Sequence, residues 1–150
     1  MNTKNVLMIQ KDIVDEIKNQ CGNIARLSPM GWHFWYNGQA YLYVNGSDKS
    51  MMRVCIPFVA GIELGNYEAL KDAVYETNTN VKFVKAILSE KDEIKVSLDY
   101  DHKLTVEESA HDIVPHVIKM LDFAASYLIE KTKNDNLEVV SDTNQGNDDE

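Results

Sequence analysis

The sequence lacks several features that would identify a function directly. It has two cysteines in 150 residues, Cys21 and Cys55, too few for a disulfide framework and without metal-ligand spacing. It contains no G-x-G-x-x-G, P-loop, H-E-x-x-H or G-x-S-x-G pattern. The longest apolar run near its start, 6–9, is shorter than a signal-peptide core of about 7–15 residues. We therefore expect a cytoplasmic protein that is not an enzyme and has no membrane partner.

Positive charge is also scarce. The chain has 15 Lys and Arg against 24 Asp and Glu, a formal net charge of −9. Six of the acidic residues lie in 134–150, which has no Lys or Arg, and this leaves −3 on residues 1–133. Without clustered basic side chains to neutralise phosphates, we expect no nucleic-acid partner. We predict one domain over 1–133 and an acidic, disordered tail over 134–150.

The first half of the chain alternates helix and strand signals. Apolar residues at three, four and seven-residue separations predict an amphipathic helix over 4–20, which ends at Gly22. A loop over 27–31 leads into a hairpin whose turn is Asn37-Gly38, since a type I′ turn needs positive φ at both central residues. A third strand follows over 51–58.

The second half predicts a helix over 67–77 with Asn66 as its N-cap, and two strands over 82–88 and 93–100. Thr105 to Glu108 matches a capping box and predicts the start of the longest helix, which runs to about residue 131 and contains Pro115. The order α-βββ-α-ββ-α predicts an α+β fold, with an antiparallel sheet packed against helices.

The predicted hairpin is the most distinctive segment, because residues 31–46 contain six Phe, Trp or Tyr rings. A two-residue turn pairs Trp32 with Tyr43 and Phe34 with Tyr41, and side chains alternate between the two faces. One face therefore carries Trp32, Phe34, Tyr36, Tyr41 and Tyr43. The opposite face carries His33, Trp35, Ala40, Leu42 and Val44.

Alternation identifies these two faces but not their neighbours. The smaller residues of the aliphatic face suit close packing against helices, which would leave the five rings to bind a protein partner or a second copy of the chain. The alternative is the reverse arrangement, in which the rings fill the core and the aliphatic face is partly exposed. Both remain open from the sequence.

Three groups of reactive side chains were considered and set aside. Asp99, Asp101 and His102 fail the calcium-loop pattern, because Leu104 stands where that loop needs glycine. His111 and His116 are five apart, which separates them by about 140° around a helix. Cys55 and His33 have no third orienting group in the sequence pattern. We predict no catalytic residue, no metal site and no cofactor.

Several segments resemble the YbjN-like family of bacterial domains, often labelled sensory-transduction regulators and related in fold to type III secretion chaperones. The resemblance lies in Asn66–Leu70, Val74–Asn78, Phe83, Ala86–Leu88, Glu93–Leu98 and Leu104–Glu107. It covers roughly residues 5–131 by element order. Pro115 and the aromatic hairpin depart from the family pattern.

The resemblance implies a cytoplasmic, non-enzymatic adaptor or chaperone-like regulator that binds a protein segment and forms a homodimer. Binding would use the aromatic sheet face or an exposed strand edge. The alternative function is a small-molecule sensor, with a pocket between the sheet and the long C-terminal helix where Pro115 opens space.

Overall fold

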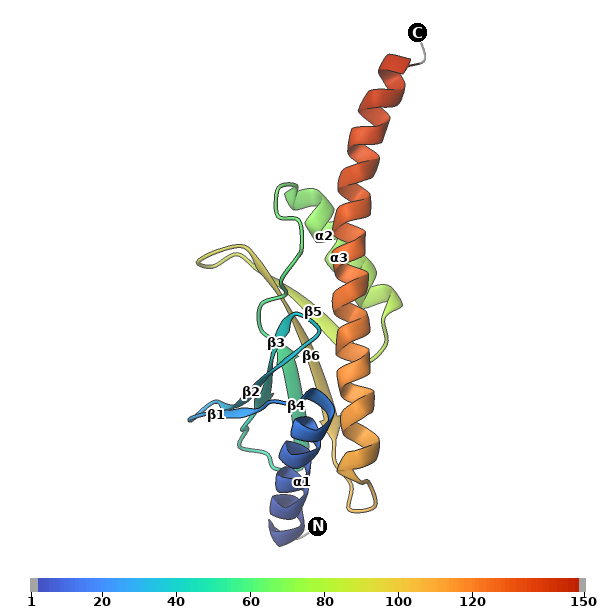
Figure 1. The fold of residues 1–150 in the computed structure, drawn as a ribbon. Coiled ribbons are helices and arrows are strands. Elements are labelled where there is room, and N and C mark those ends of the chain that lie inside the picture. The colour runs from blue at the N-terminus through green and yellow to red at the C-terminus, as the bar shows by residue number, and fades with distance from the viewer. Residues whose placement is uncertain (1–2, 149–150) are drawn as a thin grey trace.

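A computed structural model describes the backbone of residues 3–148 and the side chains of residues 9–133. Its elements in chain order are α1 (Thr3–Cys21), β1 (Ala25–Leu27), β2 (Gly31–Tyr36), β3 (Gln39–Val44), β4 (Met51–Ile56), α2 (Tyr67–Asn80), β5 (Val84–Ser89), β6 (Lys95–Lys103) and α3 (Ala110–Asp148). The predicted α+β fold is confirmed, with three helices and one antiparallel sheet (Figure 1).

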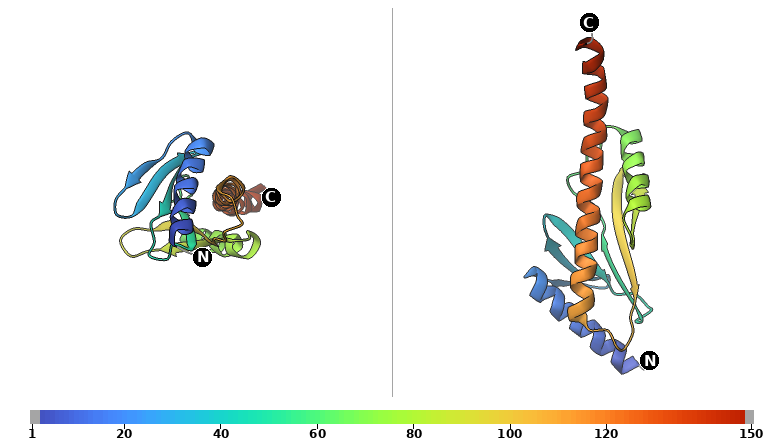
Figure 2. Two further views of the ribbon diagram at one scale, coloured as in Figure 1. Left: turned by 90° about the horizontal axis from the view of Figure 1, so that it is seen from below. Right: turned by 90° about the vertical axis from the view of Figure 1, so that its right-hand side faces the viewer.

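The sheet has six strands in the order β1-β2-β3-β4-β6-β5, and every neighbouring pair is antiparallel. The helices gather against one of its faces, and α3 runs along the sheet before extending past the rest of the chain (Figures 1 and 2). One continuous core contains residues from all three helices and five of the strands. No helix among the described residues covers the other face, which we call the open face.

The predicted hairpin and its register are confirmed. Asn37 has a φ of 50° and Gly38 a φ of 79°, as the two-residue turn requires. Trp32 pairs with Tyr43 and Phe34 with Tyr41. The helix cap predicted at Asn66 is also present, because its side-chain oxygen accepts a hydrogen bond of 3.0 Å from the Ala69 N–H.

Two elements differ from the sequence prediction. The first is β1, a strand that was not predicted. It pairs Leu27 with Gly31, the two ends of the predicted loop, and its three residues are too few to show a periodic pattern. The capping-box bond between Thr105 and Glu108 forms, but within a turn that precedes α3. The side-chain oxygen of Ser109 instead accepts from the Asp112 N–H at 3.2 Å, so the helix begins at Ala110.

The C-terminal helix continues through Pro115, whose missing N–H removes one backbone hydrogen bond within the second turn. The described backbone of α3 reaches Asp148, well beyond the predicted end near residue 131. The side chains of the predicted tail, 134–150, lie outside the described residues. The division into a domain over 1–133 and a disordered tail therefore stays a prediction.

α1 is attached to the start of α3 by apolar packing and by one polar contact. Ile13 and Ile17 are fully buried in the core. Between them in sequence, the Glu16 carboxylate lies 2.9 Å from Nδ1 of His111. This contact raises the pKa of His111 and lowers the pKa of Glu16, because each group stabilises the charged form of the other.

Gly31, at the start of β2, is required by close packing of the backbone. Its φ is +146°, and a Cβ at this position would lie 2.0 Å from the carbonyl oxygen of Tyr43. We predict that Gly31→Ala lowers the free energy of unfolding by at least about 2 kcal/mol, through backbone strain and loss of pairing.

Gly46→Ala is the matched control, because a Cβ at Gly46 would meet no atom within 4 Å. Urea unfolding of both variants measures the difference. Equal effects at the two glycines would contradict the packing argument at Gly31.

The contact between Glu16 and His111 predicts a pH-dependent contribution to stability. The raised pKa of His111 stabilises the fold below its ordinary value of 6.5, and this contribution is lost as pH rises through the raised value. The lowered pKa of Glu16 contributes above 4.5 and is lost as pH falls through the lowered value. His111→Gln should therefore be most destabilising between these two limits. Urea unfolding across this pH range measures the effect, and a difference independent of pH would refute it.

Candidate binding surface

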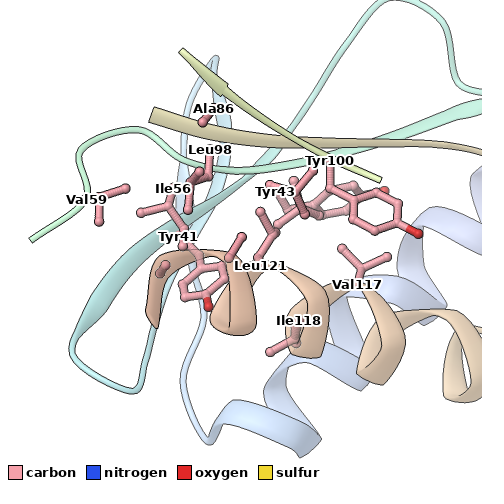
Figure 3. Close-up of a cluster of buried hydrophobic side chains, with 14 of the residues drawn as sticks. Tyr41, Tyr43, Ile56, Val59, Ala86, Leu98, Tyr100, Val117, Ile118 and Leu121 are labelled. Atoms are coloured by element: carbon pink, nitrogen blue, oxygen red, sulfur yellow. The ribbon is translucent and has the colours of Figure 1, made fainter. Parts of the chain in front are cut away.

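The five rings predicted to bind a partner lie against the helices. Phe34, Tyr41 and Tyr43 are at most 3% exposed, while Trp32 and Tyr36 are partly buried. Tyr41 and Tyr43 point from β3 toward α3 (Figure 3). The inference that the aliphatic face packs on the helices is wrong, and the alternative is confirmed: the rings fill the core. Partner binding by these rings stays a prediction, and it would require α3 to move away.

The rings share one core with buried residues of α3. Ala124 and Ala125 of α3 are at most 2% exposed and belong to this core. On the sheet the rings pack as cross-strand pairs, with centroids 5.2 Å apart for Trp32 and Tyr43.

Tyr41 is the largest fully buried side chain among the described residues. It stacks on Phe34 at 5.1 Å and meets the edge of Tyr36 at 6.2 Å. Its hydroxyl oxygen is buried and has no hydrogen-bond partner among the described residues. Burial, followed by the nearby charge of Asp122, raises the pKa of Tyr41, so the hydroxyl remains protonated.

Along each strand, the residues that alternate with the core positions lie on the open face. In the middle of the sheet, strand pairing aligns His33, Leu42, Cys55, Asp99 and Lys85 in one row across five strands. On the β1 to β3 side the face is mainly apolar, with Leu27, Trp35, Ala40, Leu42 and Val44. On the β4, β6 and β5 side it carries Arg53, Asp99, Asp101 and Lys85.

Trp35 is the largest residue exposed on the open face, at 58%. Its backbone N–H donates to Oδ1 of Asn23 at 2.8 Å, and its carbonyl oxygen accepts from Nδ2 of Asn23 at 3.0 Å. Both backbone groups are therefore held on the outer side of β2, beyond the end of β1. The indole is presented to solvent on a fixed backbone.

The charged side of the open face has an acidic group without a bonded cation. Arg53 forms two hydrogen bonds with the Asp101 carboxylate, at 2.8 and 3.3 Å. No hydrogen bond to the side chain of neighbouring Asp99 is found in the described part of the chain. Burial and the nearby Asp101 raise the pKa of Asp99.

A hollow of about 200 Å³ borders the open face beside the loop between β3 and β4. It is lined by Val44, Gly46, Ser47, Asp48, Met51 and Arg53. Val44 and Met51 give it an apolar part, and Asp48 and Arg53 give it two charged groups. Its volume suits an inserted side chain better than a whole small-molecule ligand, since ligand pockets usually measure about 300–1,000 Å³.

Side-chain amides occupy backbone groups at both edges of the sheet. Nδ2 of Asn78 donates to the carbonyl oxygen of Ala86 at 2.9 Å, and the Ala86 N–H donates to Oδ1 of Asn78 at 2.7 Å. Asn78 thus closes the outer edge of β5, as Asn23 closes the outer edge of β2 at Trp35. Such contacts protect edge strands from pairing with another chain.

The other side chains considered from the sequence do not form reactive sites. Leu42 lies between His33 and Cys55 in the row, and burial raises the pKa of Cys55 to about 12, which keeps the thiol neutral. His111 contacts Glu16, whereas His116 packs edge-on against Phe83 and Tyr100.

The side chains of Asp101 and His102, at the end of β6, bond different partners. Asp101 is bonded to Arg53 on the open face, whereas Nε2 of His102 lies 2.6 Å from the Glu108 carboxylate. Among the described residues no group of three or more His, Cys, Asp or Glu could hold a metal ion. No described helix is long and apolar enough to cross a bilayer.

A hollow does exist near Pro115, where a sensor pocket was considered. It lies between α1, β2 and α3 and is lined by Gln20, Tyr36, Pro115, Ile118 and Lys119. Its volume is about 120 Å³, well below the usual range for ligand pockets of about 300–1,000 Å³. The open face is therefore a better candidate binding site than this hollow.

A one-sided antiparallel sheet under three helices is the architecture of type III secretion chaperones and of YbjN. YbjN from E. coli matches with 9% identity and a TM-score of 0.56, over 83% of this chain and 93% of that chain. A structure of the HopA1-SchA chaperone-effector complex matches with 8% identity and a TM-score of 0.57, over 85% and 98%. The suspected relation in fold is confirmed.

The Yersinia pestis type III secretion chaperone SycH, in complex with a stable fragment of YscM2, matches with 13% identity and a TM-score of 0.52. The match covers 79% of this chain and 98% of that chain. No family model matches the sequence, and no curated protein matches it. These similarities establish the fold, and the function must be inferred from the surface of this chain.

The buried hydroxyl of Tyr41 predicts an unusual response to mutation. Tyr41→Phe removes a polar group that has no described partner and keeps the ring that stacks on Phe34. We expect the free energy of unfolding to rise by about 1 kcal/mol, because the desolvation cost of the hydroxyl disappears. Urea unfolding measures it, and a loss of stability would show that the hydroxyl is in fact bonded.

Proposed function

We propose that this protein is an adaptor that binds an extended segment of another protein on the open face of its sheet. The observation that carries the proposal is the exposed Trp35 on a face that no described helix covers. Tyrosine and tryptophan dominate binding energy at protein interfaces, because each offers a large apolar surface with a polar group. The shared fold supports this, since two of the similar structures are complexes of a chaperone with a protein partner or fragment.

The same geometry favours the face over the edges as the binding site. Strand addition requires free backbone groups along an edge strand. Asn78 occupies both groups of Ala86 on β5, and Asn23 occupies both groups of Trp35 on β2. A segment would therefore have to displace an asparagine before it could pair at either position.

The two sides of the open face suggest the chemistry of the segment. An apolar residue would contact the exposed Trp35, on the side of the face that also carries the partly exposed Ala40 and Val44. A lysine or arginine would approach Asp99, which has a raised pKa and no bonded cation among the described residues. Arg53 is already bonded to Asp101, so Asp99 is the carboxylate of this pair that an added cation could still bond.

The test compares two exposed aromatic residues on opposite sides of the molecule. Trp35 is 58% exposed on the open face, and Phe123 is 56% exposed on α3. Wild type, Trp35→Ser and Phe123→Ser would be checked for folding by circular dichroism and used to capture proteins from the host lysate. We expect a defined protein to be retained by wild type and Phe123→Ser and lost by Trp35→Ser.

A segment of the captured protein would then be titrated as a synthetic peptide in a Trp32→Phe background, where Trp35 is the only tryptophan. The fluorescence of Trp35 should shift on binding, and Asp99→Asn should weaken binding of a basic segment. Loss of capture by Phe123→Ser instead would place the interface on α3. If Trp35→Ser dissociates a dimer and leaves capture unchanged, the open face is a self-association surface.

A further inference from the structure

The chain contains two described Asn-Gly pairs in contrasting surroundings, Asn37-Gly38 and Asn45-Gly46. Asn-Gly is the dipeptide in which a side-chain amide is most open to attack by the following backbone nitrogen, because glycine has no Cβ to obstruct the approach. Asn37-Gly38 is the hairpin turn, and Asn45-Gly46 lies in the loop between β3 and β4. We propose that Asn45 is a site of spontaneous deamidation, and that Lys49 promotes the reaction.

The chemistry needs only the chain and water. The backbone nitrogen of Gly46 loses its proton and attacks Cγ of Asn45, forming a new C–N bond and a tetrahedral intermediate. The bond from Cγ to Nδ2 then breaks, and ammonia leaves with the proton. Water opens the resulting five-membered succinimide at either carbonyl, which gives aspartate or isoaspartate at position 45.

Lys49 activates the amide of Asn45. Its Nζ donates a hydrogen bond of 2.5 Å to Oδ1 of Asn45, the atom that acquires negative charge when the nitrogen attacks. A fixed cation beside a developing oxyanion lowers the barrier to acyl transfer. The Asn45 side chain is thus held with its carbonyl polarised toward attack.

The backbone around Gly46 is free to move into the attacking position. Asn45 is anchored through its own N–H, which donates to the carbonyl oxygen of Met30 at 2.8 Å. No hydrogen bond from the Gly46 N–H is found among the described residues. A Cβ at Gly46 would meet nothing within 4 Å, so neighbouring atoms do not confine the loop there.

Asn37 has the opposite surroundings. Its Nδ2 donates to a carboxylate oxygen of Asp122 at 2.8 Å, so a negative charge lies beside the amide and opposes an oxyanion. Its φ of 50° belongs to a two-residue turn closed by the pairing of Tyr36 with Gln39. The charge beside the amide therefore opposes the reaction at the hairpin turn and favours it in the loop between β3 and β4.

Deamidation of Asn45 would change the border of the open face. A carboxylate at position 45 adds a negative charge next to Lys49, beside the hollow lined in part by Gly46 and Asp48. An isoaspartate also lengthens the backbone by one carbon where β3 leaves the sheet. The inference does not depend on the proposed binding function.

The test is prolonged incubation of the folded full chain at mildly alkaline pH, followed by digestion with chymotrypsin. Cleavage after Tyr36 and Tyr43 places the two pairs in separate peptides, in which mass spectrometry detects conversion of amide to acid. We expect Asn45 to convert at least roughly tenfold faster than Asn37. Lys49→Met should slow conversion at Asn45, and Lys49→Arg should largely restore it.

Gly46→Ala should also slow the reaction, because it obstructs the attacking nitrogen without meeting a neighbour in the fold. In urea the two sites should convert at similar rates, since the contacts with Lys49 and Asp122 are absent there. Conversion of Asn37 as fast as Asn45 in the folded chain would overturn the proposal. So would an unchanged rate in a folded Lys49→Met variant, or a difference between the sites that persists in urea.

Discussion

The structure depends on how the aromatic hairpin packs against α3. The Asn37-Gly38 turn permits one register, and that register places all five rings on the same side of β2 and β3. The rings share one core with buried residues of α3, among them Leu121, Ala124 and Ala125. Because period-two alternation sends the remaining residues to the opposite side, burial of the rings also determines that Trp35 and Leu42 lie on the open face.

Near the borders of the sheet, single side-chain amides each satisfy two backbone groups. Asn23, Gln39 and Asn78 each use one side-chain amide to bond both the N–H and the C=O of a distant residue. A carboxamide has the same donor and acceptor as a peptide group, so it can replace a neighbouring strand over one residue. The Asn23 and Asn78 contacts close edge positions of β2 and β5 that would otherwise be free to pair, and the Gln39 contact satisfies Ala60 in the loop after β4.

The sequence predicted those features that depend on local signals. The hairpin register followed from Asn37-Gly38, and the helix cap followed from Asn66. It could not determine which hairpin face was buried, because that depends on contacts with segments far away in the chain. The bond between Asn37 and Asp122, which are 85 residues apart, is one such contact. Similarly, the capping-box bond at Thr105 formed without starting a helix, since Ser109 caps α3 four residues later.

The candidate surface was harder to find from sequence than the core, and the reason is physical. A fold of this kind persists at 8–13% identity because it needs a pattern of buried positions rather than particular residues. Exposed positions of the open face, Trp35 among them, are not constrained by this packing. Alternation places Trp35 on the aliphatic face, whereas the sequence favours the five rings of the other face as the partner-binding residues. What distinguishes Trp35 is the pair of hydrogen bonds that Asn23, a residue outside any recognised motif, makes with its backbone. A residue whose backbone is already fixed loses less conformational freedom on binding, and this makes Trp35 a better contact for a partner than a ring that must first leave the core.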